Sequence, residues 1–267
     1  MYTLAILLLG LASIQGQMYS MDFKEGGQTF QEMITIDKQN NILVYDVPQH
    51  ANRGAATYLK DFMNRLNVMR DSAVKTCYIW AMEQDEPTPD NVLKALTKAN
   101  FKFPQNRYWV QNDKMLQIGK YDSTKVPTII GQFCQNHKLI EVEIFASTAD
   151  MEKRVKDKIL KKYASGKTKR AVELEEYQLC KDEPKYVEHI RRCYQAGKPD
   201  LLTLKCKILL NPHCSYTVSC KKLPNQNVFV CPDPVHSMTQ IHCCTPSCAL
   251  VGTQSPTVVT NPTNKSY

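Results

Sequence analysis

Apolar and polar positions alternate over several short segments of the N-terminal half, which is the pattern of β-strands. Residues 29–35 and 42–46 are β-branched, apolar runs on either side of the polar segment 37–41, so we expect a hairpin with a five-residue loop. Residues 76–82 lack helical periodicity and predict a strand covered on both faces. Residues 139–145 alternate apolar side chains with glutamates, which predicts a strand with one exposed face.

Two further segments show helical signals. Residues 55–70 place apolar side chains three and four positions apart and predict an amphipathic helix. Thr88, followed by a proline, supplies the cap of a second helix, which we expect to end near Asn100.

Residues 108–118 surround the polar triplet 112–114 and predict a second hairpin. The N-terminal half is therefore predicted to be an α+β domain.

The C-terminal half contains only short β-prone runs, which prolines separate. The runs cover residues 201–204, 208–210, 216–218 and 228–230. We therefore expect an α+β fold, in which an antiparallel sheet of about five strands with two main helices is followed by a small disulfide-rich β domain. Thr, Pro, Asn and Ser predominate over residues 251–267, so a disordered tail is expected there.

The chain begins with an uncharged, apolar run of eleven residues from Leu4 to Ile14. A membrane-spanning helix needs about 20 apolar residues, so this run favours a secretory signal peptide over an anchor. We expect cleavage after Gly16, which makes residues 1–16 the signal peptide, with Ala12 as the second choice. The protein is then expected to enter the secretory pathway and to be secreted.

The 11 cysteines are distributed unevenly. Only Cys77 and Cys134 precede residue 170, and nine cysteines follow it. In an oxidising compartment, spaced cysteines predict disulfides before metal ligands. The nine are Cys180, Cys193, Cys206, Cys214, Cys220, Cys231, Cys243, Cys244 and Cys248, and their connectivity is left open. We expect an apolar core to hold the first half together and disulfides to hold the second.

The net charge of +8 comes almost entirely from residues 151–170, which contain nine basic and two acidic residues. A basic face over a whole domain is therefore not expected, which argues against a nucleic-acid partner. The simplest interpretation is a short, solvated, charged helix leading out of the domain. At its end, Lys167, Lys169 and Arg170 form a basic motif of the kind that furin-type convertases cleave, so we expect processing after Arg170.

The order of these features resembles the BRICHOS family over residues 30–144. A strand ending in Asp46 is followed by a helical segment, by the strand that contains Cys77, and by a second cysteine, Cys134. The resemblance implies that these three residues are the family's characteristic aspartate and cysteines, and that the cysteines form a disulfide. About thirty residues separate Asp46 from Cys77. This is roughly twice the family's spacing, which leaves open whether the helix over residues 55–70 is an insertion.

The resemblance implies a secreted proprotein with a chondromodulin- or gastrokine-like layout. Its expected parts are a BRICHOS-like domain (28–145), a basic linker (146–170), a Cys-rich domain (171–250) and the tail (251–267). The domain would act as an intramolecular chaperone and anti-aggregation module. Its partners would be the chain's own β-prone C-terminal region and a furin-type convertase. A rival hypothesis makes the Cys-rich domain a secreted ligand or defence factor, and the first half a passive propeptide or binding module.

Candidate chemistry beyond the disulfides is sparse. Asp46 is either a turn cap or a buried carboxylate whose raised pKa makes it a pH switch. The His213-Cys214 pair and the His-Cys-Cys triplet at 242–244 lack the spacing of a zinc knuckle, so no metal or cofactor is expected. We find no nucleophile motif and expect no enzymatic activity. Asn264 begins the only permitted N-glycosylation triplet.

The odd number of C-terminal cysteines has its own consequence. If Cys77 and Cys134 pair, the other nine cannot all pair within one chain. One must stay free, bond to a second chain or reach back to the first domain. We expect a disulfide-linked homodimer, with the adjacent Cys243 and Cys244 as the source of the intermolecular bond.

Overall fold

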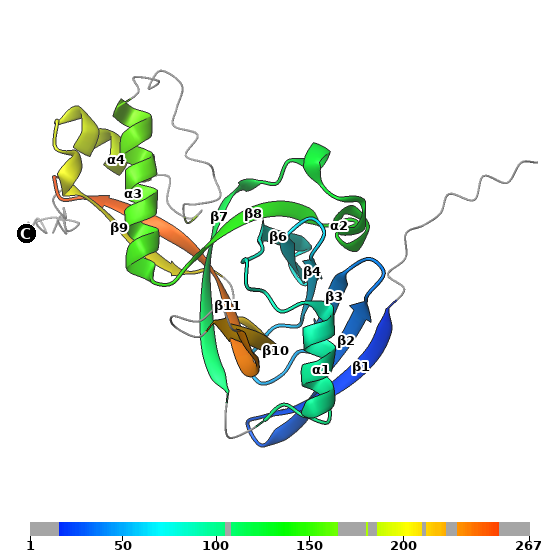
Figure 1. Cartoon of the computed structure of the whole chain (residues 1–267). Coiled ribbons are helices and arrows are strands. Elements are labelled where there is room, and N and C mark those ends of the chain that lie inside the picture. Colours follow the sequence, from blue (N-terminus) through cyan, green and yellow to red (C-terminus); the bar gives the residue numbers. More distant parts are fainter. Residues whose placement is uncertain are drawn as a thin grey trace, which may run out of the picture.

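The computed structural model of the chain describes residues 16–104, 108–164, 180, 186–209, 212–222 and 229–250 (Figure 1). The described strands are β1 (Gln17–Glu25), β2 (Gln28–Asp37), β3 (Ile42–Val47), β4 (Ala56–Asp61), β5 (Leu66–Asp71), β6 (Thr76–Ala81), β7 (Trp109–Lys120), β8 (Lys138–Phe145), β9 (Leu202–Ile208), β10 (His213–Lys222) and β11 (Phe229–Cys248). The described α-helices are α1 (Pro89–Lys98), α2 (Thr128–Phe133), α3 (Thr148–Ala164) and α4 (Tyr186–Gln195).

All of these strands belong to one sheet, in the order β1-β2-β3-β4-β5-β6-β8-β7-β11-β10, with β9 paired to β11. The first six strands form an antiparallel meander, whereas β6 with β8 and β7 with β11 are parallel pairs. The sheet curls into a nearly closed, barrel-like shape (Figure 1). The expected fold, a five-strand sheet with two main helices followed by a separate small β domain, is therefore wrong. The C-terminal strands continue the N-terminal sheet.

The helix predicted over residues 55–70 is also wrong. The segment forms the antiparallel strands β4 and β5, in which Leu59 lies opposite Val68. Asp61 ends β4 and accepts hydrogen bonds from the backbone N–H (3.0 Å) and the side-chain amide (2.7 Å) of Asn64, which closes the turn. Both strands are buried on both faces, so their apolar residues do not alternate. Their spacing then matches a helical period by coincidence.

Several local predictions are confirmed. The first hairpin is β2 and β3, and its turn is closed by Asp37, which accepts hydrogen bonds from the backbone N–H and side chain of Asn40. The covered strand is β6, the one-sided strand is β8, and α1 begins at the Thr88 cap. The basic segment forms a helix, α3, as expected, but the helix does not lead out of the domain, because Met151, Val155 and Ile159 are buried in the second core.

The second predicted hairpin, over residues 108–118, is wrong. The segment is one continuous strand, β7, and the polar triplet at its centre stays extended. The triplet pairs with β11 on one side, and from Lys114 onward β7 also pairs with β8 on the other. The triplet would favour a turn by itself, but its pairing with distant segments keeps it in a strand.

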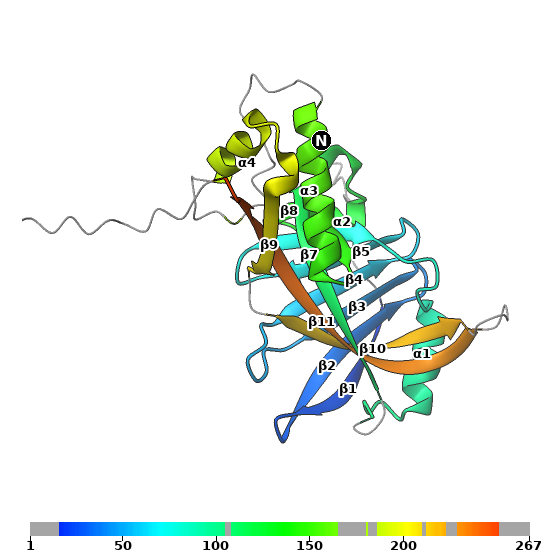
Figure 2. The same cartoon turned by 90° about the vertical axis from the view of Figure 1, so that its left-hand side faces the viewer.

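The inside of the curled sheet contains the main apolar core, to which both halves of the chain contribute. Buried members include Phe23, Tyr45, Met69, Tyr78 and Met115 from the first half, and Cys214, Tyr216 and Ile241 from the second. A second core lies beyond the curled sheet, where α3 and α4 pack on β9 and the end of β11 (Figure 2). A third lies on the outer face under α2. The main core therefore cannot be completed without the C-terminal strands.

Four disulfides are present among the described residues, which confirms that the chain is disulfide-bonded. Cys77 is joined to Cys134, the pairing that the resemblance implies. The other three are Cys180–Cys243, Cys193–Cys248 and Cys206–Cys244. Cys243 and Cys244 are thus both used within the chain, so the source proposed for an intermolecular bond is wrong. Cys214 is the free cysteine among the described side chains, which exclude those of Cys220 and Cys231.

Other expectations fall on residues that the structure does not describe. Residues 1–15 of the signal peptide, the cleavage motif at Lys167, Lys169 and Arg170, and the tail with Asn264 lie outside the described ranges. Within those ranges, no helix is both long enough and apolar enough to span a bilayer. The disulfides fit an oxidising, extracellular environment.

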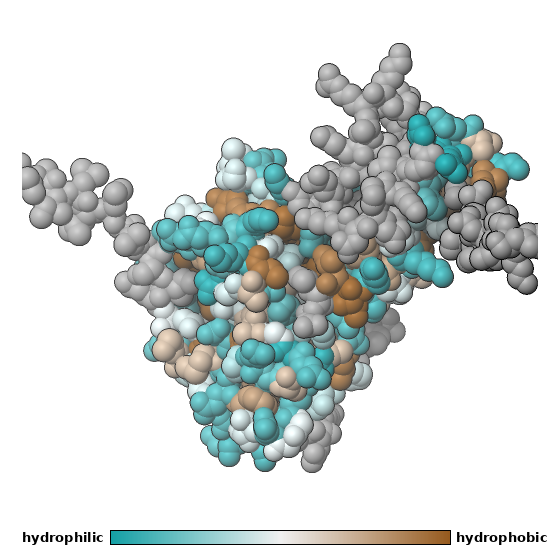
Figure 3. All heavy atoms as spheres, turned by 180° about the vertical axis from the view of Figure 1, so that it is seen from behind, coloured by the Kyte–Doolittle hydropathy of each residue, from teal (hydrophilic) through white to brown (hydrophobic). Residues whose placement is uncertain are grey.

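The outer face of the sheet carries a shallow apolar groove of about 600 Å³ beside α2. Its lining includes Met33, Val44, Ile129 and Phe133, and the exposed side chain of Met18 lies at its edge. Seen from behind, the surface is a mosaic of apolar patches separated by hydrophilic atoms (Figure 3).

Candidate functional site

The first four residues of β10, 213–216, contact a set of polar groups from the N-terminal half. We call this contact region the junction. Its N-terminal members are Glu25, Glu32, His50, Gly54 and Asp71. In the strand order β1 and β10 stand at opposite ends of the path, so the junction lies where the curled sheet nearly closes.

His213 fixes the start of β10. Its Nε2 lies 3.0 Å from a carboxylate oxygen of Asp71, and its Nδ1 lies 3.2 Å from the carbonyl oxygen of Gly54. Burial opposes ionisation of Asp71, but the hydrogen bond and charge of His213, with two backbone N–H groups, outweigh it and lower the pKa of Asp71. A Cβ on Gly54 would lie 2.6 Å from the His213 ring, so only glycine allows this approach.

Glu32, on β2, is the buried carboxyl group of the junction. Its side chain is fully buried, and Oε2 accepts a hydrogen bond of 2.9 Å from the backbone N–H of Tyr216. Its other oxygen has no hydrogen-bond partner among the described residues. Burial raises the pKa of Glu32 well above its usual value, and the single N–H donor offsets only part of this effect. Burial therefore favours the neutral form of Glu32 over the carboxylate.

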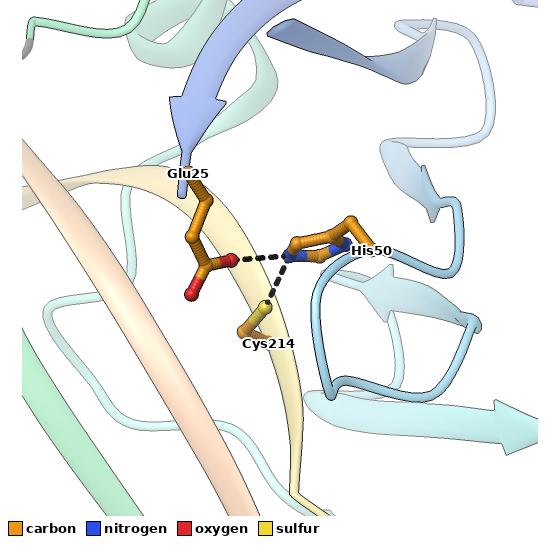
Figure 4. Close-up of side chains that lie close together, drawn as sticks. All are labelled: Glu25, His50 and Cys214. Carbon is orange, nitrogen blue, oxygen red and sulfur yellow. Dashed lines mark hydrogen bonds and ion pairs between the residues drawn. The ribbon is translucent and has the colours of Figure 1, made fainter. Parts of the chain in front are cut away.

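Glu25, His50 and Cys214 converge on one point (Figure 4). Glu25 ends β1 just before a two-glycine turn, His50 lies in the loop after β3, and Cys214 is the second residue of β10. The Nε2 atom of His50 lies 3.0 Å from Cys214 Sγ and 3.0 Å from Glu25 Oε2. The imidazole is fully buried, the thiol is buried, and the carboxylate is 22% exposed.

The hydrogen bond on the far side of the ring determines what His50 presents to this point. Nδ1 lies 2.7 Å from the carbonyl oxygen of Pro48, which can only accept, so Nδ1 carries a proton. In the neutral imidazole, Nε2 then bears a lone pair, which points toward the carboxylate of Glu25 and the sulfur of Cys214. Burial raises the pKa of the Cys214 thiol to about 12. The thiol therefore keeps its proton and can donate it to the Nε2 lone pair.

The arrangement is not that of a catalytic Cys-His-Glu triad. In such a triad the acid binds the imidazole nitrogen that faces away from the nucleophile. Here Glu25 and Cys214 contact the same nitrogen of His50, and a backbone carbonyl occupies the other. The three groups instead lie around one position, with their ligand atoms within 4.8 Å of one another.

The aspartate singled out by sequence lies elsewhere. Asp46 is exposed on β3, where it accepts a hydrogen bond of 2.9 Å from the Thr57 hydroxyl. Of the two alternatives for Asp46, the buried carboxylate is therefore wrong, because this side chain lies beside the outer-face groove and not in the main core. Glu32 has the burial that the pH-switch hypothesis requires. The Cys77–Cys134 disulfide packs under α2, in the outer-face core.

Sequence reasoning missed the cluster because its members lie far apart in the chain. His50 and Cys214 are separated by 164 positions, and no local motif connects them. The odd cysteine count was the one available signal, because it showed that one C-terminal cysteine lacks a partner in that half without saying which. The expected intermolecular bond from Cys243 or Cys244 is wrong, since both form intrachain disulfides.

A cavity of about 440 Å³ also lies on the inside of the sheet. Strands of both halves line it with polar side chains, among them Asn67, Asp113, Ser237 and the Lys60–Glu86 ion pair. The hydroxyl of Ser237 donates a hydrogen bond of 2.8 Å to Asp113, which ties β11 to β7. No family model, curated protein or solved structure matches the chain.

Proposed function

We propose that this chain is a secreted proprotein whose N-terminal half, through α3, is an intramolecular chaperone for the disulfide-rich C-terminal half. The observation that supports this most directly is the parallel pairing of β11 with β7. Val235 to His242 lie opposite Trp109 to Leu116 in unbroken register. Without β11, β7 would be an edge strand, so the C-terminal half is held by strand addition.

The side chains at the junction support the same proposal. The start of β10 contributes a cysteine and a tyrosine to the main core, while Asp71 and Glu32 bind its imidazole and backbone. The C-terminal half would thus complete its disulfides while its strands are already paired and its apolar residues buried. This arrangement limits the exposure of unpaired strands, which is the main route to β-aggregation.

The backbone is the only covalent link that the cysteine pairing leaves between the two halves. Cys77 and Cys134 are the only cysteines of the first 170 residues, and they bond to each other. No disulfide can therefore connect the halves after cleavage at Arg170. Convertase processing there would leave a non-covalent complex held by β7, β11 and the junction, and release of the C-terminal part would uncover the edge of β7.

Membership of the BRICHOS family remains part of this proposal and rests on the order of the signal segment, Cys77, Cys134 and the basic motif. Glycosylation at Asn264 and a disulfide-linked homodimer remain proposals as well. Cys214, the free thiol among the described side chains, is buried and is not the source of the intermolecular bond.

The proposal is tested by supplying the first half in trans. Residues 171–267, secreted behind a signal peptide, should be retained or mispaired when expressed alone and should be secreted with native disulfides when residues 1–170 are co-expressed. Prolines at both Val110 and Gln111 should abolish the rescue. Successive N–H groups of a strand point to opposite sides, so one of the two prolines removes a donor facing β11. Threonines at the same two positions keep both donors and are the matched control.

The rival hypothesis predicts a different result. If the first half is a passive propeptide, the C-terminal fragment should fold and be secreted equally well without it. The anti-aggregation activity is tested separately with an amyloid-forming peptide. The intact chain, in which β11 covers β7, should suppress aggregation weakly, whereas the separated fragment 17–170 should suppress it at substoichiometric ratios. Equal inactivity of both would support the rival.

A further inference from the structure

We propose that Glu25, His50 and Cys214 bind a zinc ion that connects the two halves of the chain. Two ligands come from the N-terminal half and one from β10 (Figure 4). This inference does not depend on the chaperone proposal, because the three residues meet in the folded chain whatever its function.

The chemistry of the ligand set selects the metal. A thiolate, an imidazole and a carboxylate together favour Zn²⁺, since Mg²⁺ and Ca²⁺ prefer oxygen ligands alone. A thiolate and a carboxylate carry two negative charges, which one Zn²⁺ neutralises. A buried site needs this balance, because an uncompensated charge away from water is costly.

The two spacings from His50 Nε2 are close to what the ion requires, and all three ligand atoms lie within 4.8 Å of one another. Zinc bonds of about 2.0–2.1 Å to nitrogen and about 2.3 Å to sulfur, at a tetrahedral angle, place the two ligand atoms about 3.6 Å apart. The corresponding nitrogen-to-oxygen spacing is about 3.4 Å. Both contacts of His50 Nε2 measure 3.0 Å, so each opens by roughly half an ångström to admit the ion. The loop position of His50 allows such a shift.

The surroundings orient the ligands as they do in zinc sites. The Pro48 carbonyl accepts from His50 Nδ1 and so directs the Nε2 lone pair inward. The Tyr216 hydroxyl donates a hydrogen bond of 3.1 Å to the ligating oxygen of Glu25, and Arg53 contacts the other oxygen. The rings of Phe23 and Tyr216 stack at 3.8 Å beside the cluster and limit access of water.

Binding is coupled to proton release. Without metal, the Cys214 thiol keeps its proton; as the Zn–S bond forms, this proton leaves to solvent, and the thiolate becomes the ligand. The competing occupant of the site is a proton on His50 Nε2, which would form an ion pair with Glu25 beside a neutral thiol. Metal binding and the protonated pair exclude each other, so a metal titration distinguishes them.

The experiment uses the purified full chain after removal of metal by a chelator. Zinc titration followed by desalting and elemental analysis should give one equivalent per chain, with release of at least one proton. Cobalt in place of zinc should give a sulfur-to-cobalt charge-transfer band. His50→Ala and Cys214→Ser should each weaken binding at least 100-fold, and Glu25→Gln about 10- to 100-fold. His137→Ala is the matched control, because His137 also places Nδ1 against a carbonyl two residues earlier.

Two results would overturn the proposal: less than a tenth of an equivalent of zinc bound at micromolar concentration, or unchanged binding in both His50→Ala and Cys214→Ser. The conservative Glu25→Gln variant and the cobalt band keep the test decisive if a ligand variant folds poorly. Failure here leaves the rescue of the C-terminal fragment unaffected, so the two proposals can fail separately.

Discussion

Removing the Cys77–Cys134 disulfide should destabilise the chain strongly. The bond closes a loop with a sequence separation of 57 and lies in the core between the sheet and α2. Loop-closure entropy for this length gives about 4 kcal/mol at 25 °C. Replacing both cysteines by alanine also removes two buried sulfur atoms, which adds up to about 1 kcal/mol. We therefore expect the free energy of unfolding of Cys77→Ala/Cys134→Ala to fall by 4–5 kcal/mol, as a rough figure.

The chain offers a control of almost equal loop length. Cys193 and Cys248 close a loop with a separation of 55, in the second core near α4. The same entropy argument gives about 4 kcal/mol for Cys193→Ala/Cys248→Ala. Urea unfolding of the two double variants, under non-reducing conditions, compares them directly. The fluorescence of half-buried Trp80, in the same strand as Cys77, reports unfolding of the N-terminal sheet.

The reasoning is refuted if the Cys77 and Cys134 variant loses less than about 1 kcal/mol while the control loses about 4 kcal/mol. That result would mean that α2 is held to the sheet by packing alone. Secretion is a second readout. The Cys77 and Cys134 variant should be retained in the secretory pathway, and normal secretion at an unchanged melting temperature would contradict the claim.

Three further predictions concern the junction and the processing site. Burial raises the pKa of Glu32, so its contribution to stability is full below its unfolded pKa of about 4.5 and is lost as the pH rises through the folded value. Glu32→Gln should therefore flatten the fall in stability above pH 4.5, and an unchanged pH slope in urea unfolding would count against the assignment. Gly54→Ala should cost about 1–3 kcal/mol in urea unfolding, because its Cβ would meet the His213 ring at 2.6 Å. Gly131→Ala, which meets only an ordinary contact of 3.7 Å in α2, should be neutral or stabilising by up to about 1 kcal/mol, and equal losses would contradict the steric argument. Arg170→Ala should leave a full-length secreted species, and mass spectrometry that still finds a fragment starting at Ala171 would reject the cleavage site.

The parts of the fold that sequence predicted are those with local signals. The β2–β3 hairpin carries its own turn chemistry in Asp37 and Asn40, and α1 carries its cap in Thr88. In each case the residues that specify the element lie within a few positions of one another. The hydrogen bonds that stabilise the turn and the helix cap do not depend on distant segments. A short stretch of sequence is therefore sufficient to predict these elements.

The failures arise where distant segments decide the structure. Residues 56–71 form two strands because neighbours on both faces bury them, and burial on both faces removes the alternation that identifies a strand. The triplet at 112–114 remains extended because β8 and β11, which follow it in sequence, pair with it. The sequence predicts a separate C-terminal domain because no local sequence pattern signals the parallel pairing of β11 with β7.

The candidate site was the least predictable feature for the same reason. Its three side chains come from the end of β1, a loop and β10, and only the closing of the sheet brings them together. The odd number of C-terminal cysteines showed that one of them lacks a partner within that half, and we expected it to bond to a second chain. The count could not identify Cys214, because the pairing of the other cysteines depends on the fold.

The central claim, that the N-terminal half holds the C-terminal half through β7, β11 and the junction, is tested most directly by cutting the chain at Arg170. The cut protein is analysed by size-exclusion chromatography under native conditions and by non-reducing denaturing electrophoresis. The account predicts a single native peak at the mass of the intact chain and two separate bands on the denaturing gel. Two native peaks would contradict the claim, because they would show that the backbone alone had held the halves together.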